Sequence, residues 1–410
     1  MSTAAGTARG PAPFATAAEG DPFDRSTIVA LGAAHFAHDA YPAFVGVLLP
    51  VLIDRLGISL AAAGILASSI RWSSVVGNPI LGHLGDRRDT RYWIALAPLV
   101  TAVCMSFVGL APSFAVALAL LLVTGISHSA FHPSAGAMAT RAAGRRWGRG
   151  TSYFMTGGEV GRSVGPLYIA AVISILGVGY SWLAAIPGAL ASGVLLVRLR
   201  RSKAVAVTRV RGDLLGAARQ GWRWLALLSS AMLLRATANM GFIVFYPTLA
   251  TRLGASLLAA GLGVAVYELG GVCGTLLGGT LSDRVGRRVI LSGGVAFGAP
   301  CLILALLMGF GPLQLVLLAC AGLGIVGANP VQLVVMQELL PENRGAAVGI
   351  TFLVSGLGAI VASVAVGVVA TGLGLHATLL ASSTLALLSL PLFLALPETR
   401  AVSVLAPAAD

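Results

Sequence analysis

The sequence predicts an all-α membrane protein in which twelve transmembrane helices form two parallel repeats of six. Composition is the first reason, because 57% of the 410 residues are hydrophobic and only 10% are charged, whereas soluble domains carry about 25% charged residues. The second reason is a series of long apolar runs. The third is a polar loop that occurs twice, once in each half of the chain.

The apolar runs have the length of membrane-spanning helices. A bilayer core about 30 Å thick needs about 20 apolar residues in a helix, whereas strands of a membrane barrel are about 10 residues long and alternate in polarity. Gly and Pro inside the runs fit membrane helices, because neighbouring helices satisfy the backbone groups that they free. The predicted spans cover residues 28–53, 60–82, 92–110, 113–139, 151–176, 178–198, 222–249, 256–279, 289–310, 313–337, 346–371 and 375–396.

The repeated loop predicts the internal duplication. It reads G-H-L-G-D-R-R-D-T-R from Gly82 to Arg91 and G-T-L-S-D-R-V-G-R-R from Gly279 to Arg288, an offset of 197 positions. The same offset pairs Pro50 with Pro247, Gly64 with Gly261, Gly125 with Gly322 and Pro133 with Pro330. Six spans per half start both halves on the same membrane side, so the repeats are parallel, and substrate sites in such folds lie near the midplane.

Composition also divides the chain into segments. Residues 1–25 are rich in Ala, Gly, Pro and Thr and are predicted to form a disordered cytoplasmic tail. No basic segment and short apolar segment typical of a cleaved signal peptide precede the first span. We expect six-helix halves over 26–198 and 222–398, a basic cytoplasmic linker over 199–221, and a second tail over 399–410.

The net charge of +12 follows from membrane topology. Almost all arginines outside the spans fall on one side of the twelve-span arrangement, and the opposite side holds only Arg55 and Arg252. This asymmetry predicts a multi-pass protein of the cell (inner) membrane with both termini in the cytoplasm. It also argues against binding of nucleic acid.

The repeated G-x-L-[SG]-D-R loop, between the second and third spans and again between the eighth and ninth, resembles the signature of the major facilitator superfamily. The resemblance covers nearly the whole chain, although Asp89 stands where the second copy has Gly286. It implies the major facilitator fold, with the fifth span packed against the eighth, and a monomer.

Three further motifs resemble the fosmidomycin-resistance group of bacterial drug exporters. They are H-x-x-x-D at His35 and Asp39, F-H-P ending at Pro133, and G-G-x-x-G-x-x-x-G-P from Gly157 to Pro166. The resemblance implies proton-coupled export, with a small anionic drug such as a fosmidomycin-like phosphonate among the cargoes. The chain departs from the expected pattern by carrying charges within the Gly-rich fifth span.

Ionisable residues inside the spans supply the candidate site. A charge at the bilayer centre costs about 2.5–3.5 kcal/mol, so these side chains must face the bundle interior or a wet cavity. At 1.5 Å per residue, six of them lie in one layer about 16–20 Å from the predicted cytoplasmic ends: Asp39, Arg71, Arg162, Arg235, Glu268 and His128. Glu159 and His132 lie slightly nearer the cytoplasm, and His35 and His38 are neighbours of Asp39 on the first span.

Matching depths suggest pairs within this layer. Asp39 and Arg71 lie on adjacent antiparallel spans and are expected to form an ion pair. Glu159 and Arg162 are three residues apart and share a helix face. If the fifth span packs against the eighth, Arg162 can reach Glu268 and tie the halves together. Arg71 and Glu268 occupy equivalent repeat positions with opposite charges.

These positions lead to three sets of predicted roles. Proton coupling is assigned to Asp39, Glu159, Glu268, His35 and His38. Substrate binding is assigned to Arg71, Arg162, Arg235, His128, His132, Tyr41 and Tyr267. Gating is assigned to Asp86, Arg87, Asp283, Arg284 and Arg141, with the two aspartates paired to nearby arginines such as Arg141 or Arg284, or to a helix N-terminus. A structural alternative stands beside each role: buried pairs can set helix register, histidines can bond carbonyl groups, and tyrosines can pack.

The resulting hypothesis is a proton-coupled, alternating-access transporter that exports a small anionic or zwitterionic organic compound. Proton symport of a metabolite into the cell is the main alternative, because the sequence does not determine direction. A pH sensor is disfavoured by the two complete repeats, and a membrane hydrolase by the lack of a G-x-S-x-G motif. No cofactor is expected, and no metal, because the paired histidines have no cysteine partner and no third acidic ligand on the same turn.

Overall fold

The computed structural model describes residues 23–85, 89–200 and 214–399, and within these ranges the chain is helical and contains no strand. In the part of the chain that the structure describes, twelve helical segments are long and apolar enough to cross a membrane. The predicted all-α class and the number of spans are therefore confirmed. Asp86 and Arg87, two of the predicted gating residues, lie outside the described residues.

The N-terminal half contains the first six spans. Its helices are α1 (Arg25–Ala40), α2 (Phe44–Leu56), α3 (Leu60–Gly85), α4 (Arg91–Val108), α5 (Phe114–Ala142), the 3-10 helix η1 (Gly144–Arg146), α6 (Trp147–Leu176), the 3-10 helix η2 (Val178–Ala185) and α7 (Ile186–Leu199). α1 and α2 together make the first span. They are separated at residues 41–43, where Pro42 lacks the N–H group that a continuous helix needs.

The C-terminal half repeats this order. Its helices are α8 (Leu214–Arg252), α9 (Leu257–Val285), α10 (Arg287–Leu307), α11 (Pro312–Ile325), α12 (Asn329–Leu339), the 3-10 helix η3 (Pro341–Asn343), α13 (Arg344–Leu373), α14 (Leu375–Leu387) and α15 (Ser389–Ala395). The tenth span is broken between α11 and α12. Pro330 lies in the first turn of α12, where a missing N–H group is tolerated.

Two segment boundaries differ from the expected ones. α1 begins at Arg25, because the Asp24 side chain caps it by accepting the Thr27 N–H at 3.0 Å. α8 begins at Leu214, so the last residues of the expected linker are helical up to non-helical backbone at Gly221. The remainder of that linker, residues 201–213, lies outside the described residues.

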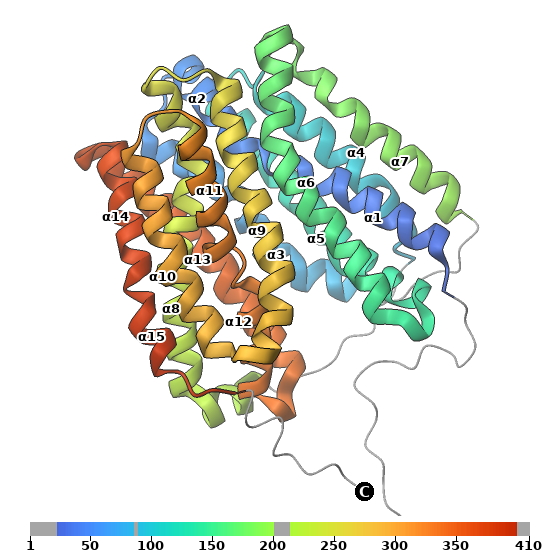
Figure 1. The fold of residues 1–410 in the computed structure, drawn as a ribbon. Coiled ribbons are helices and arrows are strands. Elements are labelled where there is room, and N and C mark those ends of the chain that lie inside the picture. The colour runs from blue at the N-terminus through green and yellow to red at the C-terminus, as the bar shows by residue number, and fades with distance from the viewer. Residues whose placement is uncertain (1–22, 86–88, 201–213, 400–410) are drawn as a thin grey trace, which may run out of the picture.

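The two halves form separate helical bundles that meet along a limited surface (Figure 1). Contact between them runs mainly through three helix pairs: α2 with α8, α3 with α13, and α6 with α9. The α6–α9 pair confirms the expected packing of the fifth span against the eighth.

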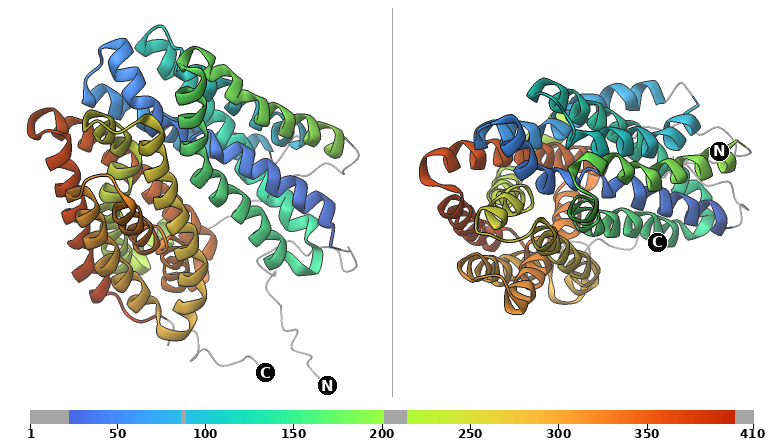
Figure 2. Two further views of the ribbon diagram at one scale, coloured as in Figure 1. Left: turned by 45° about the horizontal axis from the view of Figure 1, so that its top comes forward. Right: turned by 90° about the horizontal axis from the view of Figure 1, so that it is seen from above.

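Small residues bring the halves together near one end. A Cβ atom at Gly46 would lie 2.2 Å from the Ile243 carbonyl oxygen, and one at Gly64 would lie 2.5 Å from that of Ser363. Gly64 lies near the turn between α2 and α3, and Gly46 lies in the first turn of α2. Toward the opposite end, where α1 begins and α3 ends, the two bundles diverge (Figure 2).

Candidate functional site

Asp39 is the centre of a charged cluster in the N-terminal half. It lies near the end of α1 and is 3% exposed. Its carboxylate oxygens lie 3.3 Å from His35 Nε2, 3.2 Å from His132 Nε2 and 2.8 Å from an Arg162 guanidinium nitrogen. Arg162 also pairs with Glu159 at 2.5 Å. Three helices, α1, α5 and α6, therefore supply the cluster.

The expected Asp39–Arg71 pair is wrong, because the arginine that reaches Asp39 is Arg162. Depth along the helices did not distinguish the two arginines. The spacing of the glycines on α6 explains why Arg162 is the partner. Cβ atoms at Gly157, Gly161 and Gly165, four residues apart on one face, would lie within 2.1–2.3 Å of α1 carbonyl oxygens. The Gly-rich motif is thus the surface on which α1 packs, and it brings Arg162 to Asp39.

His35 has a defined hydrogen-bonding pattern. Its Nδ1 lies 2.7 Å from the Phe154 carbonyl oxygen, which can only accept, so Nδ1 carries a hydrogen. In a neutral ring Nε2 then has none, although it faces the Asp39 carboxylate at 3.3 Å. A second proton on His35 converts this contact into a charge-assisted hydrogen bond. His35 therefore turns Nε2 toward the Asp39 carboxylate.

The other predicted histidines surround this pair. The ring of His38 stacks on Phe131 with centroids 4.3 Å apart, and those of His128 and His132 are 3.9 Å apart. The expected grouping of four histidines in one layer is therefore present in the structure. The i,i+3 spacing of His35 and His38 on α1 and the i,i+4 spacing of His128 and His132 on α5 place each pair on one helix face.

A metal ion has potential ligands here that the sequence did not bring together. One ligand atom each from His35, Asp39 and His132 lie within 4.8 Å of one another, so the third ligand comes from a different helix. Arg162 already donates to the same carboxylate at 2.8 Å, and a guanidinium would repel a divalent cation placed there. The expectation that no metal binds stays a prediction.

The expected Arg162–Glu268 ion pair does not form, because Arg162 is engaged by Asp39 and Glu159. Glu268 is 7% exposed on α9 and Arg71 is exposed on α3. Within residues 23–85, 89–200 and 214–399, neither has a hydrogen bond or an ion pair. The charges of Arg71 and Arg162 nevertheless act on the Glu268 carboxylate through space.

Arg235 lies in a separate polar network at the broken tenth span. It is 6% exposed and donates to the Ile325 carbonyl oxygen at the end of α11. It also donates to Asn329 Oδ1 at 2.5 Å and to Gln332 Oε1 at 2.9 Å. The negative end of the α11 dipole helps to balance its charge. Arg235 thus connects the end of α11 to the start of α12. Its contact with substrate stays a prediction.

The two predicted tyrosine ligands also have protein partners. Tyr41 donates to the Ala184 carbonyl oxygen at 2.9 Å and accepts the Gly188 N–H at 2.8 Å. Tyr267 donates to Asn239 Oδ1 at 2.8 Å. These bonds connect Tyr41 to the start of the sixth span and Tyr267 to α8, rather than to the Asp39 cluster.

The predicted gating aspartate of the C-terminal half, Asp283, pairs with a nearby arginine, as expected. Its partner is Arg287 at 2.6 Å, four residues further along the chain, and not Arg141 or Arg284, which were given as examples. Arg287 also reaches Glu338 at 3.2 Å. Arg141 and Arg284 are exposed near the ends of α5 and α9.

The segment after α15 adds to this charged cluster, and the sequence did not predict its contacts. The Glu398 carboxylate accepts the backbone N–H groups of Arg287 at 2.8 Å and Arg288 at 3.2 Å, at the start of α10. Thr399 donates to Glu338. The P-E-T-R sequence that follows the last span was the available signal.

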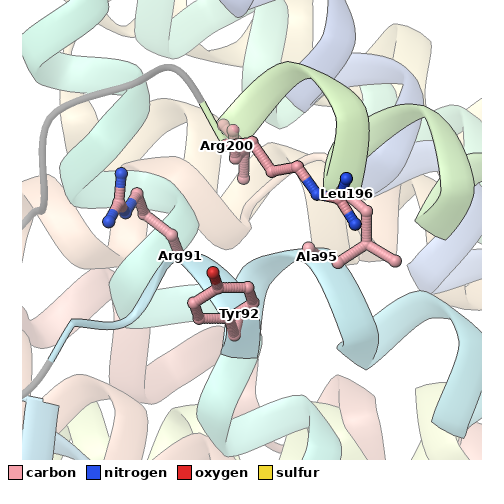
Figure 3. A pocket seen from close by; sticks show the side chains of 6 residues that line it. Arg91, Tyr92, Ala95, Leu196 and Arg200 are labelled. Carbon is pink, nitrogen blue, oxygen red and sulfur yellow. The ribbon is translucent and has the colours of Figure 1, made fainter.

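A small pocket lies away from the charged layer, at the adjoining ends of α4 and α7 (Figure 3). Its lining residues are Arg91, Tyr92, Ala95, Leu196, Leu199 and Arg200. Arg91 there pairs with Asp89 at 2.5 Å, and its hydrogen bonds lower the pKa of the Asp89 carboxyl below its usual value. None of the predicted site residues lines this pocket.

Comparison with known proteins identifies related chains. A family model described as Major Facilitator Superfamily matches residues 31–234 and again 228–409. The chain is 29% identical over 384 residues to an uncharacterized MFS-type transporter, YfnC, of Bacillus subtilis, covering 90% of this chain and 92% of the relative. It is 26% identical over 360 residues to the fosmidomycin resistance protein of Escherichia coli (83% and 86% covered). It is 26% identical over 407 residues to the gentisate transporter of Corynebacterium glutamicum (92% and 90% covered).

Solved structures share the fold at lower identity. A bacterial homolog of the human lysosomal transporter Spinster, in an inward-facing and unoccupied conformation, superposes with a TM-score of 0.76 at 17% identity, covering 92% of this chain and 97% of that one. The nucleoside transporter NupG superposes with a TM-score of 0.72 at 15% identity, covering 90% and 98%.

Proposed function

Because the chain belongs to the major facilitator superfamily, we propose that it is an alternating-access transporter that exports a small anionic or zwitterionic organic compound in exchange for protons. The observation that carries the proposal is the buried Asp39 carboxylate, shared between His35, His132 and Arg162. Relatives named for fosmidomycin resistance and for gentisate transport support small organic cargo.

The Asp39 cluster offers a route for coupling. A carboxylate paired with arginine is stabilised in its charged form, whereas one that loses its arginine in a poorly hydrated site is more easily protonated. If substrate or a change of conformation draws Arg162 away from Asp39, a proton takes its place between His35 and Asp39. When Arg162 returns, it displaces that proton. Proton binding and Arg162 pairing therefore exclude each other.

The arrangement of the halves is consistent with alternating access. They touch through α2–α8, α3–α13 and α6–α9 near one end and diverge toward the other (Figure 2). We infer from the distribution of arginines that the diverging end faces the cytoplasm of a bacterial cell and that both termini lie there. In that orientation the site faces inward, ready to load an exported substrate.

The test is transport by the purified protein in vesicles that contain a pH-sensitive dye. Fosmidomycin and gentisate are supplied as substrates on the cytoplasmic side under an imposed pH gradient. The wild type is expected to move protons against substrate, and Asp39→Asn to abolish gradient-driven transport. Asp54→Asn, an exposed carboxylate at the end of α2, is the matched control. Undiminished coupling in Asp39→Asn contradicts the proposal, and proton movement in the same direction as substrate indicates symport.

A further inference from the structure

The charged layer is unevenly paired. Arg162 lies between two carboxylates, Asp39 at 2.8 Å and Glu159 at 2.5 Å. Once this group is set aside, one cation and one carboxylate of the layer remain without a partner among the described residues: Arg71 on α3 and Glu268 on α9. Both belong to spans that line the boundary between the halves.

The repeat relates these two charges to each other. Arg71 and Glu268 are separated by the 197-position offset of the duplication. Parallel repeats are related by an axis along the membrane normal. Equivalent positions therefore lie at the same depth on opposite sides of that axis.

Both side chains lie on helix faces that meet the other half. Gly64 and Gly261 are seven residues before Arg71 and Glu268, which is two turns along the same face and about 10 Å. Gly64 approaches Ser363 of α13, and a Cβ atom at Gly261 would lie 2.8 Å from the Pro166 carbonyl oxygen of α6.

A second contact brackets Arg71. Val75, one turn further along α3, lies 3.1 Å from the Cβ position of Gly356 on α13. Arg71 is thus exposed on a face whose neighbouring turns contact the C-terminal half. Arg71 and Glu268 also act on each other electrostatically through space, as opposite charges do.

We propose that Arg71 and Glu268 form a bipolar clamp that selects zwitterionic substrates, small compounds that carry both an acidic group and an amine. Arg71 binds the acidic group through two parallel charge-assisted hydrogen bonds, and Glu268 binds the ammonium group. This inference rests on the proposed function, since it assumes that substrate binds in the central layer.

The clamp accounts for the charge balance of the layer. A purely anionic ligand on Arg71 leaves the buried Glu268 without a counter-charge and adds a second negative charge near it. A purely cationic ligand on Glu268 leaves Arg71 without a counter-charge and adds a second positive charge near it. Arg162 is already engaged in the Asp39 cluster, so substrate binding and proton binding use different residues of one layer.

The test uses matched ligand sets that differ only in charge. Binding to the purified protein is measured by calorimetry at pH 7 for two sets: 3-aminopropylphosphonate, propylphosphonate and propylamine, and 3-(aminomethyl)benzoate, 3-methylbenzoate and benzylamine. In at least one set the zwitterion is expected to bind about tenfold more tightly than either singly charged member. The clamp is overturned if the anion binds as tightly as the zwitterion, or if no zwitterion binds in either set.

Variants of the two charged residues test which side chain binds which group. Glu268→Gln is expected to reduce the preference for the zwitterion over the anion to less than twofold while the anion still binds. Arg71→Gln is expected to weaken the binding of both the zwitterion and the anion. The exchanged pair Arg71→Glu with Glu268→Arg is expected to restore the preference, because the two positions are equivalent. Size-exclusion profiles establish that each variant is folded. If Glu268→Gln keeps the full preference, Glu268 is not the amine ligand.

The proton-coupling assay separates this inference from the proposed function. Loss of coupling in Asp39→Asn together with no preference for zwitterions leaves the transporter proposal intact and removes the clamp. Intact coupling in Asp39→Asn together with a clear preference for zwitterions supports the clamp and contradicts the proposed role of Asp39 in proton coupling.

Discussion

Arg162 donates a 2.8 Å hydrogen bond to Oδ2 of Asp39 and so joins α6 to α1 within the N-terminal half. Asp39 is nearly fully buried, whereas the Arg162 side chain is 36% exposed. The carboxylate therefore depends on an arginine that can still reach solvent. This relationship underlies both the stability of the half and the coupling that we propose.

Replacing Arg162 with Gln is expected to destabilise the protein by about 1–3 kcal/mol, because Asp39 stays buried without its main counter-charge. The partial exposure of Arg162 keeps the loss below that of a fully buried pair. Thermal unfolding of the purified protein measures it, with Arg252→Gln at the exposed end of α8 as control. The double variant Arg162→Gln with Asp39→Asn is expected to lose less stability than the two single variants lose together. Additive effects would show that the two residues are not coupled.

Replacing Gly161 with Ala is expected to force α1 away from α6, since the new Cβ atom would lie 2.3 Å from the Phe36 carbonyl oxygen. Overpacking of this kind costs about 1–3 kcal/mol. Gly193→Ala is the matched control, because a Cβ atom at that α7 position meets nothing within 4 Å. Melting temperatures of the two variants provide the measurement. Equal temperatures would contradict the close α1–α6 contact.

Replacing Glu398 with Ala is expected to loosen the start of α10, because two backbone N–H groups lose their acceptor. The loss of a helix cap costs about 1 kcal/mol. Hydrogen exchange at Arg287 and Arg288 should become faster, with Glu398→Gln giving a smaller change because it keeps one acceptor oxygen but no charge. Unchanged exchange in Glu398→Ala would mean that the segment after α15 does not cap α10.

Asp24 should make the stability of α1 depend on pH. The Thr27 hydroxyl, at 2.6 Å, lowers the pKa of the Asp24 carboxyl below its ordinary value of 3.8. A lowered pKa means that the stabilisation is complete above the unfolded-state value and is lost as the pH falls through the folded-state value. Asp24→Ala should therefore be less stable than wild type by about 1 kcal/mol at pH 6. The difference should shrink toward pH 3; a difference that grows there would contradict this role. Thermal unfolding across this pH range measures both.

Much of the site could be predicted because depth follows from position along a helix. The rise of 1.5 Å per residue is enough to place Asp39, Arg162 and His132 in one layer. Which of them touch depends on helix rotation and on which helices are neighbours. Arg71 and Arg162 have similar depths, yet only Arg162 reaches Asp39, because the α6 glycines allow α1 to approach.

The partners of other side chains could not be predicted for the same reason. Asp283 was expected to pair with a nearby arginine such as Arg141 or Arg284, and it pairs with Arg287 across the bend at Gly286 (φ +111). Arg235 was grouped with the layer by depth, but the broken tenth span surrounds it with acceptors. A helix break that exposes a carbonyl group is difficult to recognise before the tertiary structure is known.

The sequence by itself determined the number of spans, the duplication, the family resemblance and the set of charges held within the membrane. These follow from hydrophobic length and from the cost of placing charge in lipid, which are properties of single helices. Only the tertiary structure decided that Asp39 forms its ion pair with Arg162 and that Glu398 caps α10. It also decided that Arg71 and Glu268 have no ion-pair partner among the described residues. Those outcomes depend on contacts between helices, where a glycine or a break of one turn changes which side chains meet.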